Sequence, residues 1–146
     1  MKRKKFIKTC GFGLVGLPLA TSLIQSCTGI HYAMAHENNG VITIAKSQFI
    51  INRQKPEHLR KFVMVQSSLF KFPLCVYQTE SETYVTCLMR CTHRGCELNV
   101  GGGIYSCPCH GSEFTNDGTV ITGPADENLL TFTTITDAEN ITIHLS

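Results

Sequence analysis

Apolar and polar residues alternate along most of the chain beyond residue 40, with the two-residue period of half-buried β-strands. Helical periodicity is weak and is limited to one turn around residues 56–59. The tripeptide Asn116-Asp117-Gly118 predicts a hairpin turn. The pattern therefore predicts an all-β domain of small antiparallel sheets. Runs rich in β-branched and aromatic residues predict its strands at residues 41–44, 61–65, 74–77, 83–88, 129–136 and 140–145.

The first 26 residues have a different pattern from the rest of the chain. They contain five basic residues and no acidic one, and an apolar run covers residues 10–24. A membrane span needs about 20 apolar residues, so this shorter run, interrupted by glycine and proline, predicts a signal peptide over residues 1–26. A retained helical anchor is the alternative. Polar residues 27–40 predict a tether, and residues 41–146 predict a single domain.

Removing this leader changes the sign of the net charge. The whole chain carries 13 basic and 11 acidic residues, which gives +2. Five of the basic residues lie in the leader, so 8 basic and 11 acidic residues remain and the mature part carries −3. No basic run survives outside the leader, which argues against a nucleic-acid partner.

Candidate chemistry is concentrated in two short blocks, residues 91–96 and 107–112. Each block has one Cys and one His at ligand spacing, Cys91-x-His93 and Cys107-x-x-His110, and each has one spare cysteine. Two thiolates and two imidazoles suit a 2Fe-2S cluster with mixed ligation. They also suit a tetrahedral zinc ion.

The blocks read C-T-H-R-G-C and C-P-C-H-G-S, and this pair resembles the Rieske iron-sulfur proteins of cytochrome bc complexes. The resemblance implies the Rieske fold over about residues 41–146, with a two-loop subdomain that binds a 2Fe-2S cluster. It also implies a disulfide between the spare cysteines, whereas zinc would leave these and Ser112 without a role. We therefore expect the cluster. Its implied ligands are Cys91 and Cys107 on the inner iron and His93 and His110 on the outer iron, with Cys96 and Cys109 as the disulfide.

The same resemblance assigns roles to residues after the second block. Ser112 would donate a hydrogen bond from its hydroxyl to a bridging sulfide. Phe114 stands where this branch usually has a tyrosine, so one hydrogen bond to sulfur is missing, which predicts a lower reduction potential than in a tyrosine-bearing relative. Gly123 and Pro124 resemble the start of the proline loop that covers the cluster.

Two features of the leader indicate export. Residues 3–8, Arg-Lys-Lys-Phe-Ile-Lys, resemble a twin-arginine signal with lysine in the second position, a route that exports folded proteins. Ordinary unfolded secretion is the alternative. Residues 23–27 end in Ser26-Cys27 and resemble a lipoprotein cleavage site, which makes Cys27 the lipidated residue. These features predict a protein on the periplasmic side of a bacterial envelope, where a disulfide persists.

Cys75 and Cys87 lie symmetrically about Ser81, so a hairpin turning there would bring them face to face. They could form a second disulfide. Alternatively, both are small buried hydrophobic residues, as free cysteines often are.

The predicted function is one-electron transfer by a membrane-tethered carrier, or by a subunit of a quinol:cytochrome c reductase-like respiratory chain. The expected partners are a cytochrome c or cytochrome b and quinol, and we predict no catalytic residue. The alternative is the small Rieske subunit of an exported oxidoreductase of the arsenite oxidase type. A cytoplasmic Rieske ferredoxin would lack Cys27, Cys96 and Cys109, and a dioxygenase would need a further catalytic domain.

Overall fold

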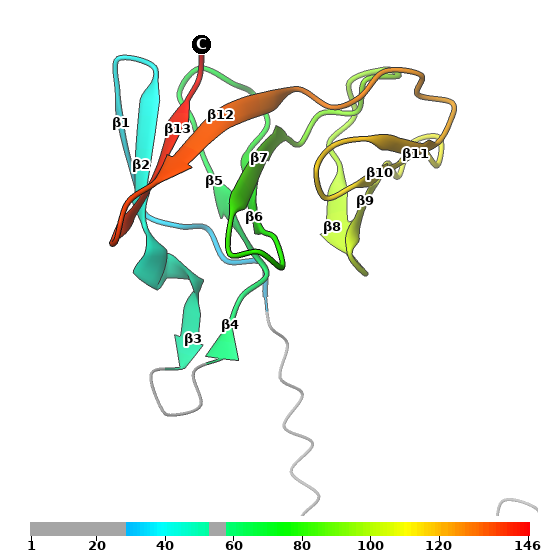
Figure 1. Ribbon diagram of the computed structural model, residues 1–146. Coiled ribbons are helices and arrows are strands. Elements are labelled where there is room, and N and C mark those ends of the chain that lie inside the picture. Colours follow the sequence, from blue (N-terminus) through cyan, green and yellow to red (C-terminus); the bar gives the residue numbers. More distant parts are fainter. Residues whose placement is uncertain (1–28, 53–57) are drawn as a thin grey trace, which may run out of the picture.

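The computed structural model describes residues 29–52 and 58–146 as an all-β protein. A seven-stranded antiparallel sheet has the order β1-β2-β13-β12-β7-β6-β5, and a four-stranded sheet, to its right in Figure 1, has the order β11-β10-β9-β8. Strands β3 and β4 form a separate pair. The predicted fold class is confirmed. The elements are β1 (Ala35–Asn38), β2 (Val41–Ala45), η1 (Lys46–Phe49), β3 (Ile50–Asn52), β4 (His58–Leu59), β5 (Phe62–Val65), β6 (Leu74–Gln78), β7 (Tyr84–Leu88), β8 (Asn99–Gly101), β9 (Ile104–Ser106), β10 (Glu113–Thr115), β11 (Val120–Thr122), β12 (Thr131–Thr136) and β13 (Asn140–His144).

The predicted tether and the predicted helical turn both need correction. Strand β1 pairs with β2 along its whole length, from Ala35 opposite Ile44 to Asn38 opposite Val41, so the domain begins before residue 41. An edge strand exposed to water needs no apolar side chains, which is why its polar sequence indicated a tether. Residues 58–59 form strand β4 rather than a helical turn.

Strands β5, β6 and β7 are buried on both faces, and this arrangement positions the candidate site. Side chains of successive residues point to opposite faces of a strand. Val63 and Val65 contact a core formed with β2 and β13, whereas Met64 between them contacts a second core. The second core also contains Cys91 and Cys107, so the two candidate cysteine ligands pack against the back of the large sheet.

The small sheet is closed by the predicted turn at residues 116–118, which connects β10 to β11. Gly118 has φ +88°, a conformation that favours glycine. A Cβ atom there would lie 3.2 Å from the Cys87 Sγ and 3.2 Å from the Leu129 Cβ. The backbone of this turn therefore packs directly against the large sheet.

We predict that Gly118→Ala destabilises the domain by about 2 to 4 kcal/mol, through backbone strain and overpacking. Urea unfolding followed by circular dichroism measures the effect. Gly101→Ala is the matched control, because Gly101 has no positive φ and a Cβ there meets nothing within 4 Å. An equal loss of stability in the two variants would contradict the packing argument.

Predictions on the leader fall outside the described residues. They comprise the signal peptide at residues 1–26, the twin-arginine-like segment and the lipidation site Cys27. Within the described part of the chain, no helix has the length and apolar character needed to cross a membrane.

Candidate metal centre

The two Cys/His blocks form two loops at the same end of the small sheet, at the upper right of Figure 1. The first loop, residues 91–96, lies between β7 and β8, and the second, residues 107–112, lies between β9 and β10. Strands β8 and β9 pair with each other, as do β9 and β10, so the sheet brings together two segments whose first residues are 16 positions apart in the sequence.

Both loops have the same backbone hydrogen-bond frame. In the first, the Cys91 N–H donates to the Cys96 carbonyl and the Gly95 N–H donates to the Cys91 carbonyl, both at 2.8 Å. In the second, the Cys107 N–H donates to the Ser112 carbonyl at 2.8 Å and the Gly111 N–H donates to the Cys107 carbonyl at 3.0 Å. Each frame closes through a glycine with positive φ, 75° at Gly95 and 79° at Gly111. This repeat holds the first cysteine of each loop in an equivalent position.

Four cysteines of the loops divide into two pairs with different states. Cys96 and Cys109 form a disulfide that joins the loops, with their Cα atoms 6.5 Å apart. Cys91 and Cys107 are free thiols, 1% and 4% exposed. The Sγ atoms of Cys96, Cys107 and Cys109 lie within 4.8 Å of one another, but the disulfide leaves only Cys107 of these three as a ligand.

The two histidines lie together on the outer side of the loops. The ring centroids of His93 and His110 are 4.9 Å apart with an interplanar angle of 85°. His110 is exposed, and the buried Nδ1 atom of His93 has no hydrogen-bond partner. A buried ring nitrogen without a partner requires an explanation, and a neutral imidazole nitrogen is a common metal ligand. The free thiols and this nitrogen fit a group with sulfur and imidazole ligands.

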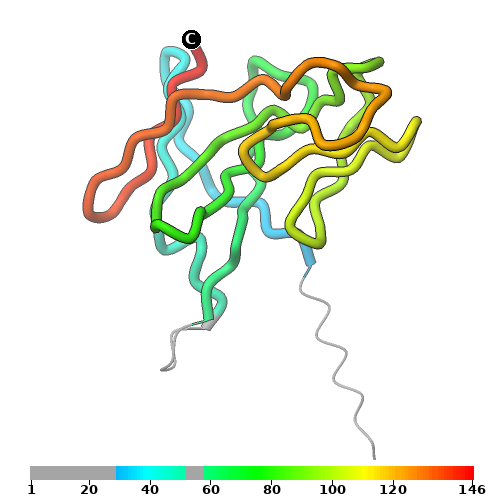
Figure 2. Tube along the Cα trace, turned by 45° about the vertical axis from the view of Figure 1, so that its right-hand side comes forward, coloured from blue at the N-terminus to red at the C-terminus, as the bar shows by residue number. Residues whose placement is uncertain are grey.

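A third segment covers the loops. The Ser112 hydroxyl is fully buried and accepts a hydrogen bond from the Ala125 N–H at 3.0 Å. The Thr92 hydroxyl donates to the Glu127 carbonyl at 2.7 Å. Residues 123–130, the orange segment of Figure 2, are therefore attached to both loops.

Phe114 is fully buried in the same core as Cys91 and Cys107, where it presents a ring without a hydroxyl. The hydroxyl of the neighbouring Tyr105 donates instead to the Asn116 carbonyl at 3.1 Å. Of Ser112 and Phe114, only Ser112, at the end of the second loop, offers a hydroxyl. Phe114 contributes only apolar packing.

Cys75 and Cys87 face each other in the ladder of β6 and β7, as the symmetry about Ser81 predicted. Both are free thiols with no exposed surface, which agrees with their interpretation as small buried residues rather than a second disulfide. Burial raises the pKa of Cys75 to about 12, and burial together with the nearby Cys75 raises the pKa of Cys87 to about 12. Burial also raises the pKa of Tyr105, which lies beside them.

These raised pKa values predict that the protein loses stability in alkali. The folded state holds both thiol protons above the ordinary pKa of 9.0, whereas the unfolded chain releases them. The contribution is present below pH 9 and is lost as the pH rises toward 12, by at most about 1.4 kcal/mol per pH unit per thiol. Urea unfolding between pH 8 and 11 tests this, with Cys75→Ala/Cys87→Ala as comparison. A double variant with the wild-type slope would refute the prediction.

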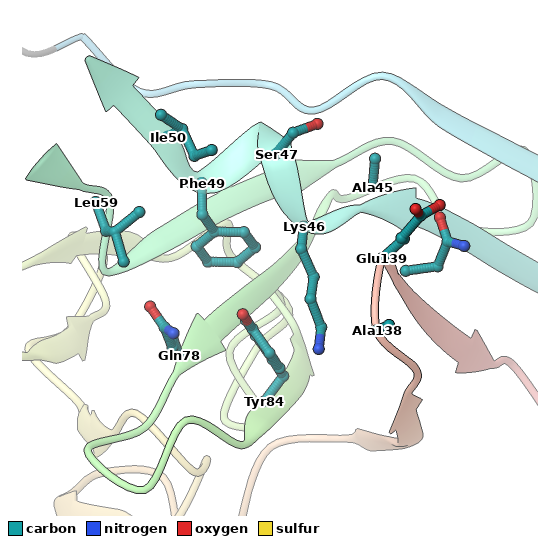
Figure 3. A pocket seen from close by; sticks show the side chains of 11 residues that line it. Ala45, Lys46, Ser47, Phe49, Ile50, Leu59, Gln78, Tyr84, Ala138 and Glu139 are labelled. Atoms are coloured by element: carbon teal, nitrogen blue, oxygen red, sulfur yellow. The ribbon is translucent and has the colours of Figure 1, made fainter. Parts of the chain in front are cut away.

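A hollow in the surface lies away from the loops, beside η1. It has a volume of about 460 Å³, and the side chains of Lys46, Phe49 and Tyr84 converge on it (Figure 3). The rings of Phe49 and Tyr84 pack edge to face with their centroids 5.1 Å apart. None of the residues predicted for the metal centre lines this hollow.

Comparison with known proteins decides the family. A match to the Rieske [2Fe-2S] domain covers residues 50–133, which include both loops and the covering segment. The chain belongs to the Rieske family. A 2Fe-2S cluster is the cofactor of this domain, so the cluster is favoured over the zinc ion that the four ligands alone left open.

Relatives of this Rieske protein include iron-sulfur subunits of cytochrome b6-f complexes. It is 43% identical over 53 residues to the cytochrome b6-f complex iron-sulfur subunit of Synechococcus sp. (strain JA-2-3B'a(2-13)), a match that covers 35% of this chain and 31% of that one. It is 39% identical over 56 residues to the cytochrome b6-f complex iron-sulfur subunit 2 of Synechocystis sp. (strain ATCC 27184 / PCC 6803 / Kazusa). The matches span about a third of the length of these relatives.

Solved structures agree with the family. The crystal structure of the cyanobacterial plasma membrane Rieske protein PetC3 from Synechocystis PCC 6803 is 32% identical, with a TM-score of 0.51 over 57% of this chain and 85% of that one. A chain from the complex of oxygenase and ferredoxin in carbazole 1,9a-dioxygenase has a TM-score of 0.54 at 17% identity, over 73% of this chain and 94% of that one. The second likeness shows the fold alone.

The residues that shape the loops of this Rieske protein were not predicted from the sequence. Gly95 and Gly111 each stand four positions after the first cysteine of their block, and this repeat of C-x-x-x-G was a signal in the sequence. Thr92 and Ala125 carried no signal, because each forms a hydrogen bond between a side chain and the backbone of a segment that is distant in the chain.

Proposed function

We propose that this Rieske protein transfers single electrons, as a carrier or electron-transfer subunit tethered on the outer face of a bacterial membrane. When bound, the 2Fe-2S cluster accepts and releases one electron at a time. The observation that carries the proposal is the pairing of two buried free thiols with two adjacent imidazoles, one of which has a buried nitrogen without a partner.

In this proposal Cys91 and Cys107 hold the inner iron and His93 and His110 hold the outer iron. The buried thiols exclude water from one side of the site. The exposed His110 provides the path by which an electron passes between the site and a partner. The Cys96–Cys109 disulfide and the shared hydrogen-bond frame fix the distance between the loops. Ser112 accepts a bond from Ala125, so its own proton is directed elsewhere, and we assign that proton to a sulfur of the cluster.

Partners of the cytochrome b and cytochrome c type, with quinol as the electron donor, are proposed on two grounds. The relatives named above are iron-sulfur subunits of cytochrome b6-f complexes. The disulfide matches the branch that the sequence resembles. A respiratory quinol:cytochrome c reductase-like chain fits both, and an arsenite oxidase-type assembly is the second outcome of the test.

Purification from membranes of the native organism tests the partners. A C-terminal tag keeps the leader intact, and mild detergent preserves complexes. We expect a cytochrome b to co-purify with the tagged chain and quinol to reduce the cluster, as read by electron paramagnetic resonance. A molybdenum-containing polypeptide in its place would overturn the respiratory assignment while keeping electron transfer.

We predict that Cys27→Ala moves the mature protein from the membrane fraction to the soluble fraction, because it removes the proposed site of lipid attachment. Two acyl chains give stable anchoring, whereas one chain binds marginally. Cys10→Ala is the matched control, since Cys10 lies within the proposed leader. Immunoblots of fractionated cells measure both variants. Retention of Cys27→Ala on the membrane would argue for an uncleaved anchor.

A further inference from the structure

A cleft of about 340 Å³ lies beside the first cluster loop, and we call it the basic cleft. One wall comes from the connection between β5 and β6 and the other from the end of β7 and the loop. The Met89 N–H donates to the Pro73 carbonyl at 3.0 Å and attaches the two walls to each other. The lining residues are Leu69, Phe70, Lys71, Phe72, Leu88, Arg90, Arg94 and Gly95.

The basic cleft concentrates positive charge on an acidic domain. The described residues contain six Lys and Arg side chains against ten Asp and Glu, and three of those six basic residues line this cleft. No acidic residue lines it. Glu97 lies opposite Arg90 in an isolated bridge, yet within residues 29–52 and 58–146 no carboxylate forms an ion pair with a basic side chain. The charge of the basic cleft is therefore available to a partner.

Two of these basic side chains are held in place by packing. The Arg90 guanidinium lies against Gly95, where a Cβ atom would approach its Nε to 3.2 Å. The Lys71 Nζ lies 5.4 Å from the centroid of the Phe72 ring, a cation–π contact. Prior ordering reduces the entropy lost when a partner binds. Leu69, 61% exposed, adds an apolar contact surface at the same place.

We propose that the basic cleft docks an acidic segment of the redox partner protein beside His93, which rests on the proposed function in electron transfer. Guanidinium groups bind carboxylates in a bidentate manner, and complementary charge steers the encounter of two proteins. Arg94 follows His93 directly, so a segment seated in the cleft would bring its protein alongside the imidazole edge of the site. The occupant is thus an anionic stretch of protein rather than a cationic one.

Binding of fluorescein-labelled hexaglutamate to the mature holoprotein, purified from its native host, tests this inference. Anisotropy is measured at roughly 20 mM ionic strength, where charge interactions are weakly screened. We expect saturable binding that Lys71→Glu/Arg94→Glu weakens by about tenfold or more. Lys46→Glu/Lys61→Glu is the control with the same change of net charge, and it should weaken binding less than about twofold. Lys71→Gln/Arg94→Gln repeats the test with a milder change, in case charge reversal disturbs folding.

Three results would overturn the inference: no binding to the wild type, equal loss in the cleft and control variants, or equal binding of hexalysine. The reduction potential and visible spectrum of each sample are recorded alongside. A chain without a reducible cluster would refute the proposed electron transfer, whereas peptide binding reports on the basic cleft independently. The two failures are therefore distinguishable.

Discussion

Replacing Cys107 by alanine is expected to abolish cluster binding, with iron content falling at least about tenfold and the visible absorption disappearing. The second loop has two cysteines, but Cys109 is committed to the disulfide with Cys96. No other free thiol lies within that loop, so the chain has no substitute for this ligand among its described residues. Iron analysis and the spectrum of the purified holoprotein measure the loss.

Cys75→Ala is the matched control for this variant. Cys75 is also a free thiol, fully buried and in the same apolar core, so the substitution removes an equivalent side chain without removing a proposed ligand. We expect a stability loss of about 1 to 2 kcal/mol with full cluster content. A Cys107→Ala protein that keeps the spectrum, or a Cys75→Ala protein that loses it, would contradict the ligand assignment.

Replacing Ser112 by alanine is expected to lower the reduction potential by roughly 60 mV. A hydrogen bond to a charged sulfur favours the more electron-rich reduced state, and about 1.4 kcal/mol corresponds to 59 mV for one electron. The same substitution leaves the buried Ala125 N–H without an acceptor, which costs about 1 to 3 kcal/mol of stability. Redox titration followed by electron paramagnetic resonance gives the potential.

Ser67→Ala is the control for the potential. Ser67 is also a buried serine whose hydroxyl takes part in hydrogen bonds, with Glu37 and Leu69, but it lies outside the cluster core. Its removal should alter stability and leave the potential unchanged. If Ser112→Ala has the wild-type potential, the Ser112 hydroxyl proton is not directed at a cluster sulfur. Since Phe114 has no hydroxyl, neither of these two residues would then donate a hydrogen bond to the cluster.

Most strands were predictable from the sequence because their burial determines their composition. Residues 41–44 and 140–145 alternate between core and surface, and that alternation is visible without a structure. Strand β1 was not predicted because it is mostly exposed at the edge of the sheet, so its sequence needs no apolar residues. The strands of the small sheet have only three residues each, too few to establish a period.

The candidate ligands were predictable because few residue types bind iron and because their spacing within a loop is local. The contacts between segments were not. Ser112 was identified from the motif, but its hydrogen bond to Ala125 depends on how the chain returns from β11 to β12. Likewise, Tyr105 reaches the Asn116 carbonyl only because β9 and β10 pair in one register.

The burial of β5, β6 and β7 on both faces has a mechanical consequence. One face of these strands packs against the core shared with β2 and β13, and the other packs against the core that contains Cys91 and Cys107, so the strands join the two loops to the rest of the large sheet. Close-packed interiors transmit displacement rather than absorb it. We expect the two loops and the large sheet to move together as one rigid body.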